Sequence, residues 1–156
     1  MSQFEDSRVR VRVQTNPAVE LSVIDAGPRQ AKPVLLFVQG AGGHALQWVN
    51  QLRYFSQHHR CLAPDLRGHG YSDKPRTDYT VEEMTGDLLA VLDGIGIVEP
   101  VVMLAHSAGG LLAINFAASY PERLTKLVLV NTAANLPLNR WMRLGLRTPS
   151  ILMILV

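Results

Sequence analysis

Short apolar stretches recur along the chain in patterns that are typical of strands. RVRVRVQ, residues 8–14, alternates polar and apolar positions, which indicates a strand with one face buried. VELSVIDAG, residues 19–27, predicts a second strand that ends at Gly27 and Pro28. Later runs are short and almost continuously apolar, as expected of parallel strands covered on both faces. These runs are residues 33–39, 101–105 and 124–131, with a weaker one at 60–65.

Helical patterns lie between these runs. Trp48, Leu52 and Phe55 have helical spacing, and a further helix is expected over residues 108–120, ended by Pro121. The clearest helix begins at Thr80, where Glu83 completes a capping box. Its apolar face is formed by Val81, Met84, Leu88, Val91, Leu92 and Ile95, and Gly94 and Gly96 end it. Strands that alternate with helices predict an α/β fold, a mostly parallel sheet with helices on both faces.

Composition narrows the classes of protein. The chain has 156 residues, 47% of them hydrophobic, which is enough for one globular domain. The net charge of +2 and the absence of a Lys/Arg run argue against a nucleic-acid partner. Cys61 is the single cysteine, so no intrachain disulfide can form. Residues 1–10 lack the apolar core of a signal peptide, and the apolar run 151–156 is too short to span a bilayer. We therefore expect a cytoplasmic protein without stable membrane insertion, which takes a small-molecule substrate.

VVMLAHSAGG, residues 101–110, carries a predicted strand into a predicted helix with almost no loop between them. Ser107 stands at that corner, and the residues two before and two after it, Ala105 and Gly109, are small. The pattern A-x-S-x-G resembles the nucleophile elbow of the α/β-hydrolases, which is usually G-x-S-x-G. The resemblance implies that Ser107 is a nucleophile and that the Ala108 N–H is an oxyanion-hole donor. The alternative for Ser107 is a helix N-cap. His106 is expected to pack rather than to act as base, because adjacent residues on so sharp a turn point apart.

Three other segments resemble the same family. LAPDLRGHGYSDKP, residues 62–75, is similar to the loop after the fourth strand in members that carry a cap, such as serine esterases, C–C hydrolases and haloperoxidases. QGAGGHALQW, residues 39–48, is similar to the oxyanion loop, and SYPERLTKLVLVN, residues 119–131, to the passage into the sixth strand. The resemblance implies that Ala41 supplies the second oxyanion N–H. Gln39 stands where the family usually has histidine.

One rival motif uses the same loop. Gly40-x-Gly42-x-x-Ala45 follows a buried strand, and Asp65 ends the next one, which together satisfy the dinucleotide-binding fingerprint. Two strands precede this one, however, whereas a dinucleotide fold usually opens with its fingerprint strand. A non-catalytic α/β scaffold is a third interpretation.

The sequence does not favour a metal site. His58, His59, Cys61, Asp65 and His69 could be ligands by type, but they show no paired zinc spacing. No metal and no cofactor are expected.

Catalytic partners for Ser107 are missing from the later part of the sequence. In this fold the chain order is Ser, then acid, then His. After Ser107 there is no histidine, and Glu122 is the one carboxylate. Residues 1–132 are interpreted as the N-terminal part of an α/β-hydrolase core, and residues 133–156 as the start of an incomplete helical cap. In that cap Thr148 and Pro149 are expected to begin a last helix. The far edge of strand 124–131 is then expected to stay unpaired, which predicts self-association.

These observations predict a serine hydrolase that acts on an ester or related carbonyl substrate through an acyl-enzyme, with the chain itself an inactive fragment. An aspartate-nucleophile dehalogenase or epoxide hydrolase is disfavoured because the elbow residue is serine.

Overall fold

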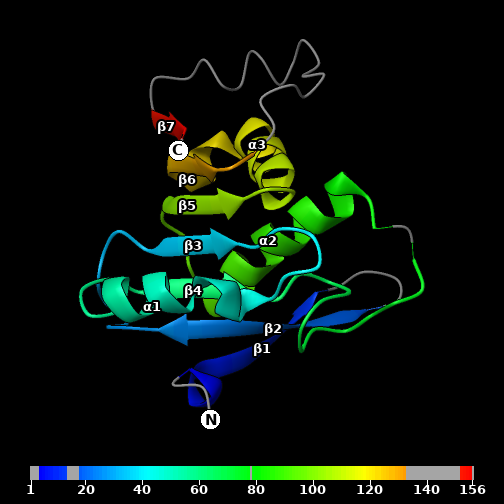
Figure 1. Ribbon diagram of the computed structural model, residues 1–156, viewed down its shortest axis with the longest axis horizontal. Coiled ribbons are helices and arrows are strands. Elements are labelled where there is room, and N and C mark those ends of the chain that lie inside the picture. The colour runs from blue at the N-terminus through cyan, green and yellow to red at the C-terminus, as the bar shows by residue number, and fades with distance from the viewer. Residues whose placement is uncertain (1–3, 14–17, 78, 133–151, 156) are drawn as a thin grey trace.

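A single seven-stranded sheet organises the computed structural model, which describes residues 4–13, 18–77, 79–132 and 152–155. The strand order is β1-β2-β4-β3-β5-β6-β7 (Figure 1). The strands are β1 (Arg8–Val13), β2 (Val19–Ala26), β3 (Leu35–Val38), β4 (Cys61–Pro64), β5 (Val101–His106), β6 (Leu124–Val130) and β7 (Leu152–Leu155). The pairs β1–β2 and β2–β4 are antiparallel, and the remaining pairs are parallel. The mostly parallel α/β fold predicted from the sequence is confirmed.

Helices connect the parallel strands. They are α1 (Val49–Phe55), α2 (Val81–Ile95) and α3 (Gly109–Ser119), with the 3₁₀ turns η1 (Glu5–Ser7), η2 (Ala45–Trp48) and η3 (Pro121–Arg123). The predicted capping box opens α2: the Glu83 N–H donates to Thr80 Oγ1 at 3.1 Å, and the Thr80 N–H donates to Glu83 Oε2 at 3.3 Å. Gly96 ends α2 in the left-handed conformation, with φ of 81°.

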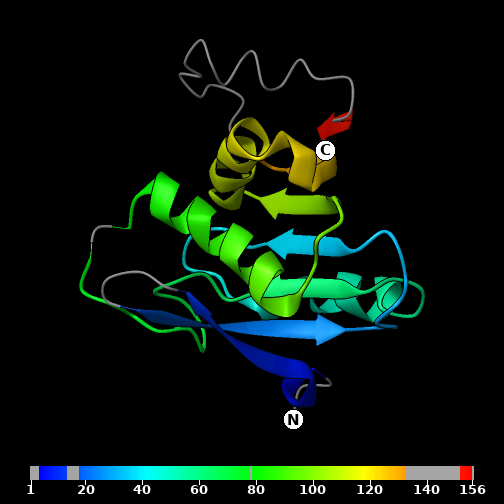
Figure 2. The same ribbon diagram turned by 180° about the vertical axis from the view of Figure 1, so that it is seen from behind.

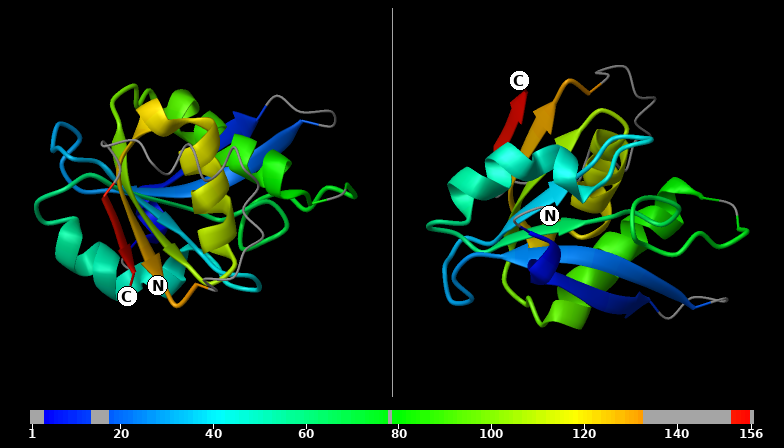
Figure 3. Two further views of the ribbon diagram at one scale, coloured as in Figure 1. Left: turned by 90° about the horizontal axis from the view of Figure 1, so that it is seen from above. Right: turned by 60° about the horizontal axis from the view of Figure 1, so that its bottom comes forward.

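Two apolar cores cover the two faces of the sheet. One core joins α2 and α3 to the sheet, and the other joins η2 and α1 to it. Seen from above, α1 lies on one side of the strands and α2 and α3 on the other (Figure 3), and from behind α2 crosses the sheet (Figure 2). Because both faces are covered, β3 is buried at every position, which explains its unbroken apolar run.

A buried ion pair fastens the loop after β4 to α2. The Arg67 guanidinium donates to both carboxylate oxygens of Asp87, at 2.6 and 2.7 Å, and both side chains are 1% exposed. Burial raises the pKa of Asp87, and the hydrogen bonds from Arg67 oppose that rise. The pair holds in place a loop that reaches the site described below.

The C-terminal strand corrects one expectation. Residues 152–155 were expected to lie in a cap helix and to leave the far edge of residues 124–131 unpaired. Instead Leu152–Leu155 is strand β7, which pairs in parallel with residues 126–129 of β6. The prediction was wrong because a short, continuous run of apolar residues has no periodicity that distinguishes a strand from a helix. The remainder of the expected cap, residues 133–151, lies outside the described residues.

Within the part of the chain that the structure describes, no helix has the length and apolar character needed to cross a membrane.

Candidate active site

Ser107 occupies the corner between β5 and α3. Its φ is +50°, in the left-handed region that a non-glycine residue rarely adopts. The Ser107 N–H donates to the Val130 carbonyl oxygen at 3.1 Å, and the Ser107 carbonyl accepts from the Gly110 N–H at 2.9 Å. The residue is exposed, at the N-terminus of α3, where free N–H groups favour negative charge. The strained corner expected from the sequence is present.

Small residues let the corner pack tightly against β3. A Cβ atom on Gly109 would lie 2.3 Å from the Gln39 carbonyl oxygen and 2.9 Å from that of Val38. The helix start therefore rests on the end of β3 with no room for a side chain. Ala105, where the family usually has glycine, is fully buried within β5, so the fold accommodates its methyl group.

The oxyanion loop, residues 40–43, lies beside Ser107. The Gly43 N–H donates to the Gly40 carbonyl oxygen at 3.2 Å, which closes a four-residue turn. Gly42, the third residue of the turn, has φ of +71°, a conformation that favours glycine there. A Cβ atom on Gly40 would lie 3.1 Å from Ser107 Cβ, so the turn and the corner are in close contact.

Two side chains hold the oxyanion loop. Gln39 is fully buried, and its Nε2 donates to the Gly43 carbonyl oxygen at 2.9 Å. The Gly42 N–H donates to Nε2 of His69 at 3.1 Å, and the other ring nitrogen, Nδ1, lies 2.9 Å from the Arg67 carbonyl oxygen. Gln39 thus anchors a loop that histidine usually introduces in the family. The contact of His69 with the oxyanion loop could not be predicted, because no sequence pattern near residue 42 or residue 69 indicates that the two residues meet.

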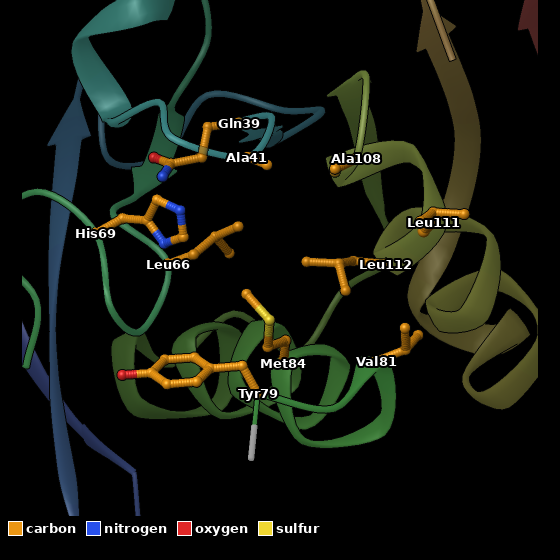
Figure 4. Close-up of a pocket in the computed structure, with 11 residues that line it drawn as sticks. Gln39, Ala41, Leu66, His69, Tyr79, Val81, Met84, Ala108, Leu111 and Leu112 are labelled. Atoms are coloured by element: carbon orange, nitrogen blue, oxygen red, sulfur yellow. The ribbon is translucent and has the colours of Figure 1, made fainter. Parts of the chain in front are cut away.

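An apolar pocket joins the two expected oxyanion donors. Ala41 and Ala108 both line it, and its volume is about 240 Å³. In Figure 4, Gln39, His69 and Leu66 form one side, Leu111 and Leu112 the other, and Tyr79, Met84 and Val81 the base. None of the lining side chains carries a fixed charge. The structure therefore brings Ala41 and Ala108, which are far apart in sequence, to one rim, next to Ser107.

His106 points away from this pocket, toward η2 and α1. It lines a second hollow of about 350 Å³ with Gln47, Trp48, Gln51 and Val130. Its Nδ1 lies 3.4 Å from Nε2 of Gln47. The residue is half-buried, and its role as a packed support residue stays a prediction.

The Asp65 carboxylate accepts hydrogen bonds from the protein itself, which leaves it unsuited to bind a ligand. It is fully buried, and its carboxylate accepts from the Ala45 N–H at 2.6 Å, the Tyr71 N–H at 3.0 Å and Nη1 of Arg8 at 2.9 Å. A ribose hydroxyl could not replace these partners without leaving buried donors unpaired. With β1 and β2 preceding the glycine turn as well, the dinucleotide interpretation is wrong.

No cluster of three or more potential metal ligands occurs among the described residues. Cys61, one of the residues considered, is fully buried, and burial, with a smaller contribution from Asp25, raises its pKa to about 12.

Comparisons with known proteins agree with this geometry. Residues 33–152 match the family model of the alpha/beta hydrolase fold. The chain is 40% identical over 102 residues to epoxide hydrolase 1 of Caenorhabditis elegans, a match that covers 64% of this chain and 25% of that protein. It is 31% identical over 131 residues to a cis-3-alkyl-4-alkyloxetan-2-one decarboxylase of Xanthomonas campestris, covering 79% and 43%.

The fold of the chain is also similar to that of a solved structure. The structure is similar to that of a thermophilic esterase from Thermogutta terrifontis, with a TM-score of 0.74 and 31% identity, covering 83% of this chain and 48% of the esterase. The chain spans less than half the length of each of these three proteins. From the family match and the shared fold, the chain belongs to the alpha/beta hydrolase fold family.

Proposed function

We propose that Ser107 is the nucleophile of a serine hydrolase that acts on an ester or a related carbonyl compound and needs no cofactor. The observation that carries this proposal is the φ of +50° at an exposed serine at the start of α3. A strained backbone persists only where the surrounding structure enforces it, and such residues cluster at active sites. An N-cap serine has no need of this conformation, because N-cap residues ordinarily adopt extended backbone angles.

The chemistry follows from the neighbours of Ser107. Its hydroxyl oxygen attacks the substrate carbonyl carbon, and the carbonyl oxygen becomes an oxyanion. The backbone N–H groups of Ala41 and Ala108 donate to that oxygen, aided by the N-terminus of α3. A general base takes the hydroxyl proton of Ser107 and passes it to the leaving alkoxide, which departs as the alcohol and leaves an acyl group on Ser107. Water then attacks that acyl group, which leaves as the carboxylic acid, and Ser107 regains its proton.

The apolar pocket supports a substrate with an apolar substituent. Its rim carries both proposed oxyanion donors, so the carbonyl group would sit at the mouth and the group attached to it would extend inward. Leu66, Met84 and Leu112 offer no hydrogen-bonding groups there, which favours an alkyl or aryl group over a charged one.

Serine at the corner separates this proposal from epoxide opening, which the name of one relative suggests. A carboxylate nucleophile that opens an epoxide forms an ester, and water can hydrolyse an ester. A serine that opened an epoxide would form an alkyl ether, which has no carbonyl carbon for water to attack. Ser107 therefore favours a substrate that already contains the carbonyl group, as esters do.

The general base is expected C-terminal to Ser107, by the order of the family, yet residues 108–156 contain no histidine. We therefore propose that the 156-residue chain alone acylates slowly and turns over no ester.

Covalent labelling tests the proposal. The chain is incubated with an activated alkyl fluorophosphonate, and the modified residue is located by mass spectrometry of peptides. Slow modification confined to Ser107, and lost in Ser107→Ala, is the expected result. Modification of Ser107→Ala to the same extent, or no modification of the wild type after prolonged incubation, would favour a non-catalytic scaffold. Hydrolysis of p-nitrophenyl acetate should not exceed the Ser107→Ala background.

A further inference from the structure

We propose that His69 is a positioning residue of this site: its neutral imidazole holds the oxyanion loop so that the Ala41 N–H faces the substrate oxygen. The inference rests on the proposed function, because it concerns the geometry of the proposed oxyanion hole. His69 precedes Ser107 in the sequence, so it is not the histidine base that the family places after the nucleophile. It contacts the oxyanion loop from the loop after β4.

The two hydrogen bonds of the ring define its protonation state. The Arg67 carbonyl oxygen can only accept, so Nδ1 must carry the proton at that 2.9 Å contact. The Gly42 N–H can only donate, so Nε2 must be the unprotonated acceptor at 3.1 Å. Both bonds are satisfied together only by a neutral ring with its proton on Nδ1. Arg67 is itself fixed by Asp87, so the ring has a rigid support.

His69 binds the one peptide group that can flip within the turn. Turns of types I and II differ mainly in the orientation of the central peptide, here between Ala41 and Gly42. The φ of +71° at Gly42 belongs to the second type, and the N–H that His69 accepts belongs to that same peptide. Gln39 restrains the last residue of the turn through the Gly43 carbonyl, but no bond from Gln39 reaches the central peptide. The Ala41 N–H belongs to the preceding peptide, so Ala41 joins the proposed donor to the peptide that His69 holds. Removing the acceptor on His69 therefore frees Ala41 on its C-terminal side.

Protonation of His69 should have the same effect as its removal. A protonated Nε2 would point an N–H at the Gly42 N–H, and the flipped turn, with the Ala41 carbonyl toward the ring, would be favoured. The charged groups nearby are already paired: Asp65 accepts from Arg8, and Arg67 donates to Asp87. The other titratable neighbour in the pocket, Tyr79, donates its hydroxyl to the Pro75 carbonyl oxygen. Among the described contacts, no carboxylate bonds to His69 to favour its charged form.

Two substitutions separate the acceptor from the bulk of the ring. The Gln side chain can place Oε1 near the position of Nε2 and does not titrate, whereas Asn reaches only the position of Nδ1. His69→Asn should therefore lower the rate of fluorophosphonate labelling at Ser107 by about tenfold to a hundredfold, somewhat less than the 10²–10³ that loss of a whole oxyanion donor costs. His69→Gln should stay near the wild-type rate. The exposed His58, in the turn after α1, supplies the matched control His58→Gln, which should label like the wild type.

The pH profile gives a readout that a purely structural role would not. Labelling of the wild type and of His58→Gln should fall as the pH is lowered, because a proton on Nε2 removes the acceptor of the Gly42 N–H, and His69→Gln should lack that fall. Equal losses in His69→Gln and His69→Asn, or the same pH profile in all variants, would overturn the proposal. Thermal melts of each variant show whether a loss of labelling reflects unfolding instead.

Nuclear magnetic resonance tests the contact without relying on catalysis. Long-range ¹H–¹⁵N spectra should show His69 with its proton on Nδ1, and the Gly42 amide signal should move when the pH is lowered. A Gly42 amide that ignores both acidification and His69→Asn would overturn the proposal even if Ser107 labels. If the amide responds but Ser107 never labels, the loop contact stands and the proposed hydrolase function fails.

Discussion

At the scale of single residues, Cys61 gives the clearest dependence on pH. Burial, with a smaller contribution from Asp25, raises its pKa in the fold to about 12, whereas a thiol in an unfolded chain ionises near pH 8.5. Between these values only the unfolded state releases the proton. The free energy of unfolding should therefore fall as the pH rises above about 9, with a slope from this thiol approaching about 1.4 kcal/mol per pH unit.

Urea unfolding of the wild type and of Cys61→Ala at several pH values from 8 to 10.5 measures this effect. The two proteins share their other titrating groups, so the stability advantage of the wild type should shrink with rising pH. A difference that stays constant over this range would show that the thiol ionises in the folded protein as readily as in the unfolded chain.

Some residues of the site are indicated by the sequence next to them, and others are placed by contacts with distant parts of the chain. The corner at Ser107 and Ala108 could be predicted because a strand, a turn and the start of a helix lie within ten residues. Ala41 followed from a similar local resemblance. The anchoring by Gln39 and His69 could not be predicted, because the His69 bond spans 27 residues and depends on how β3 and β4 pair.

At the scale of elements, two glycines in helices should respond in opposite ways to alanine. Gly86 lies within α2 with nothing within 4 Å of an added Cβ, so Gly86→Ala should stabilise the protein by about 1 kcal/mol through helix propensity. Gly109 begins α3 with the Gln39 carbonyl oxygen 2.3 Å from an added Cβ. Gly109→Ala should destabilise it by about 1–3 kcal/mol through overpacking, and should slow labelling at Ser107.

Chemical denaturation of both variants checks these signs. Stabilisation by Gly109→Ala would mean that the start of α3 can move from β3 at no cost, which would remove the packing argument for the corner. Loss of stability in Gly86→Ala would show that α2 is more closely packed at that point than its open surroundings indicate.

Most elements were predictable from the sequence, including the short apolar runs that form β3, β4, β5 and β6, whereas the run that forms β7 was not. The helix α2 combines two independent signals, an apolar face and the capping box at Thr80, and β1 shows a regular alternation of polar and apolar residues. The run at residues 152–155 is shorter than two helical turns, so only its pairing with β6 decides that it is a strand.

At the scale of the whole molecule, β7 covers the edge of β6 and is itself the last strand of the sheet. Residues 126–129 of β6 pair with it, so the N–H and C=O groups along that side have partners. Ending the chain at residue 151 should replace the 4-residue edge strand β7 by the 7-residue strand β6, and the longer edge should favour association between copies. Size-exclusion chromatography with light scattering should then show larger species for residues 1–151 than for residues 1–156. Equal masses for the two chains would mean that β7 does not protect β6 in solution.

The site lies where the order of the sheet reverses. From β3 the chain moves to β4 on one side and then returns to β5 on the other, so the loops that follow β3 and β5 open at the same edge. Such a switch point is where open α/β sheets bind ligands. Alternating strands and helices predict the fold class, but only the order of the strands shows that residues 40–43 and Ser107 meet.

This order of strands also bears on how the chain could fold while it is being synthesised. The hairpin of β1 and β2 can form as soon as it leaves the ribosome, because its pairing is local. The central strand β3 has to wait, because both of its neighbours, β4 and β5, are made after it. Its fully apolar sequence has two unpaired edges until β4 has emerged, and one until residue 106 has emerged. The segment that supports the site is thus the one most open to capture by chaperones, and to misfolding, during translation.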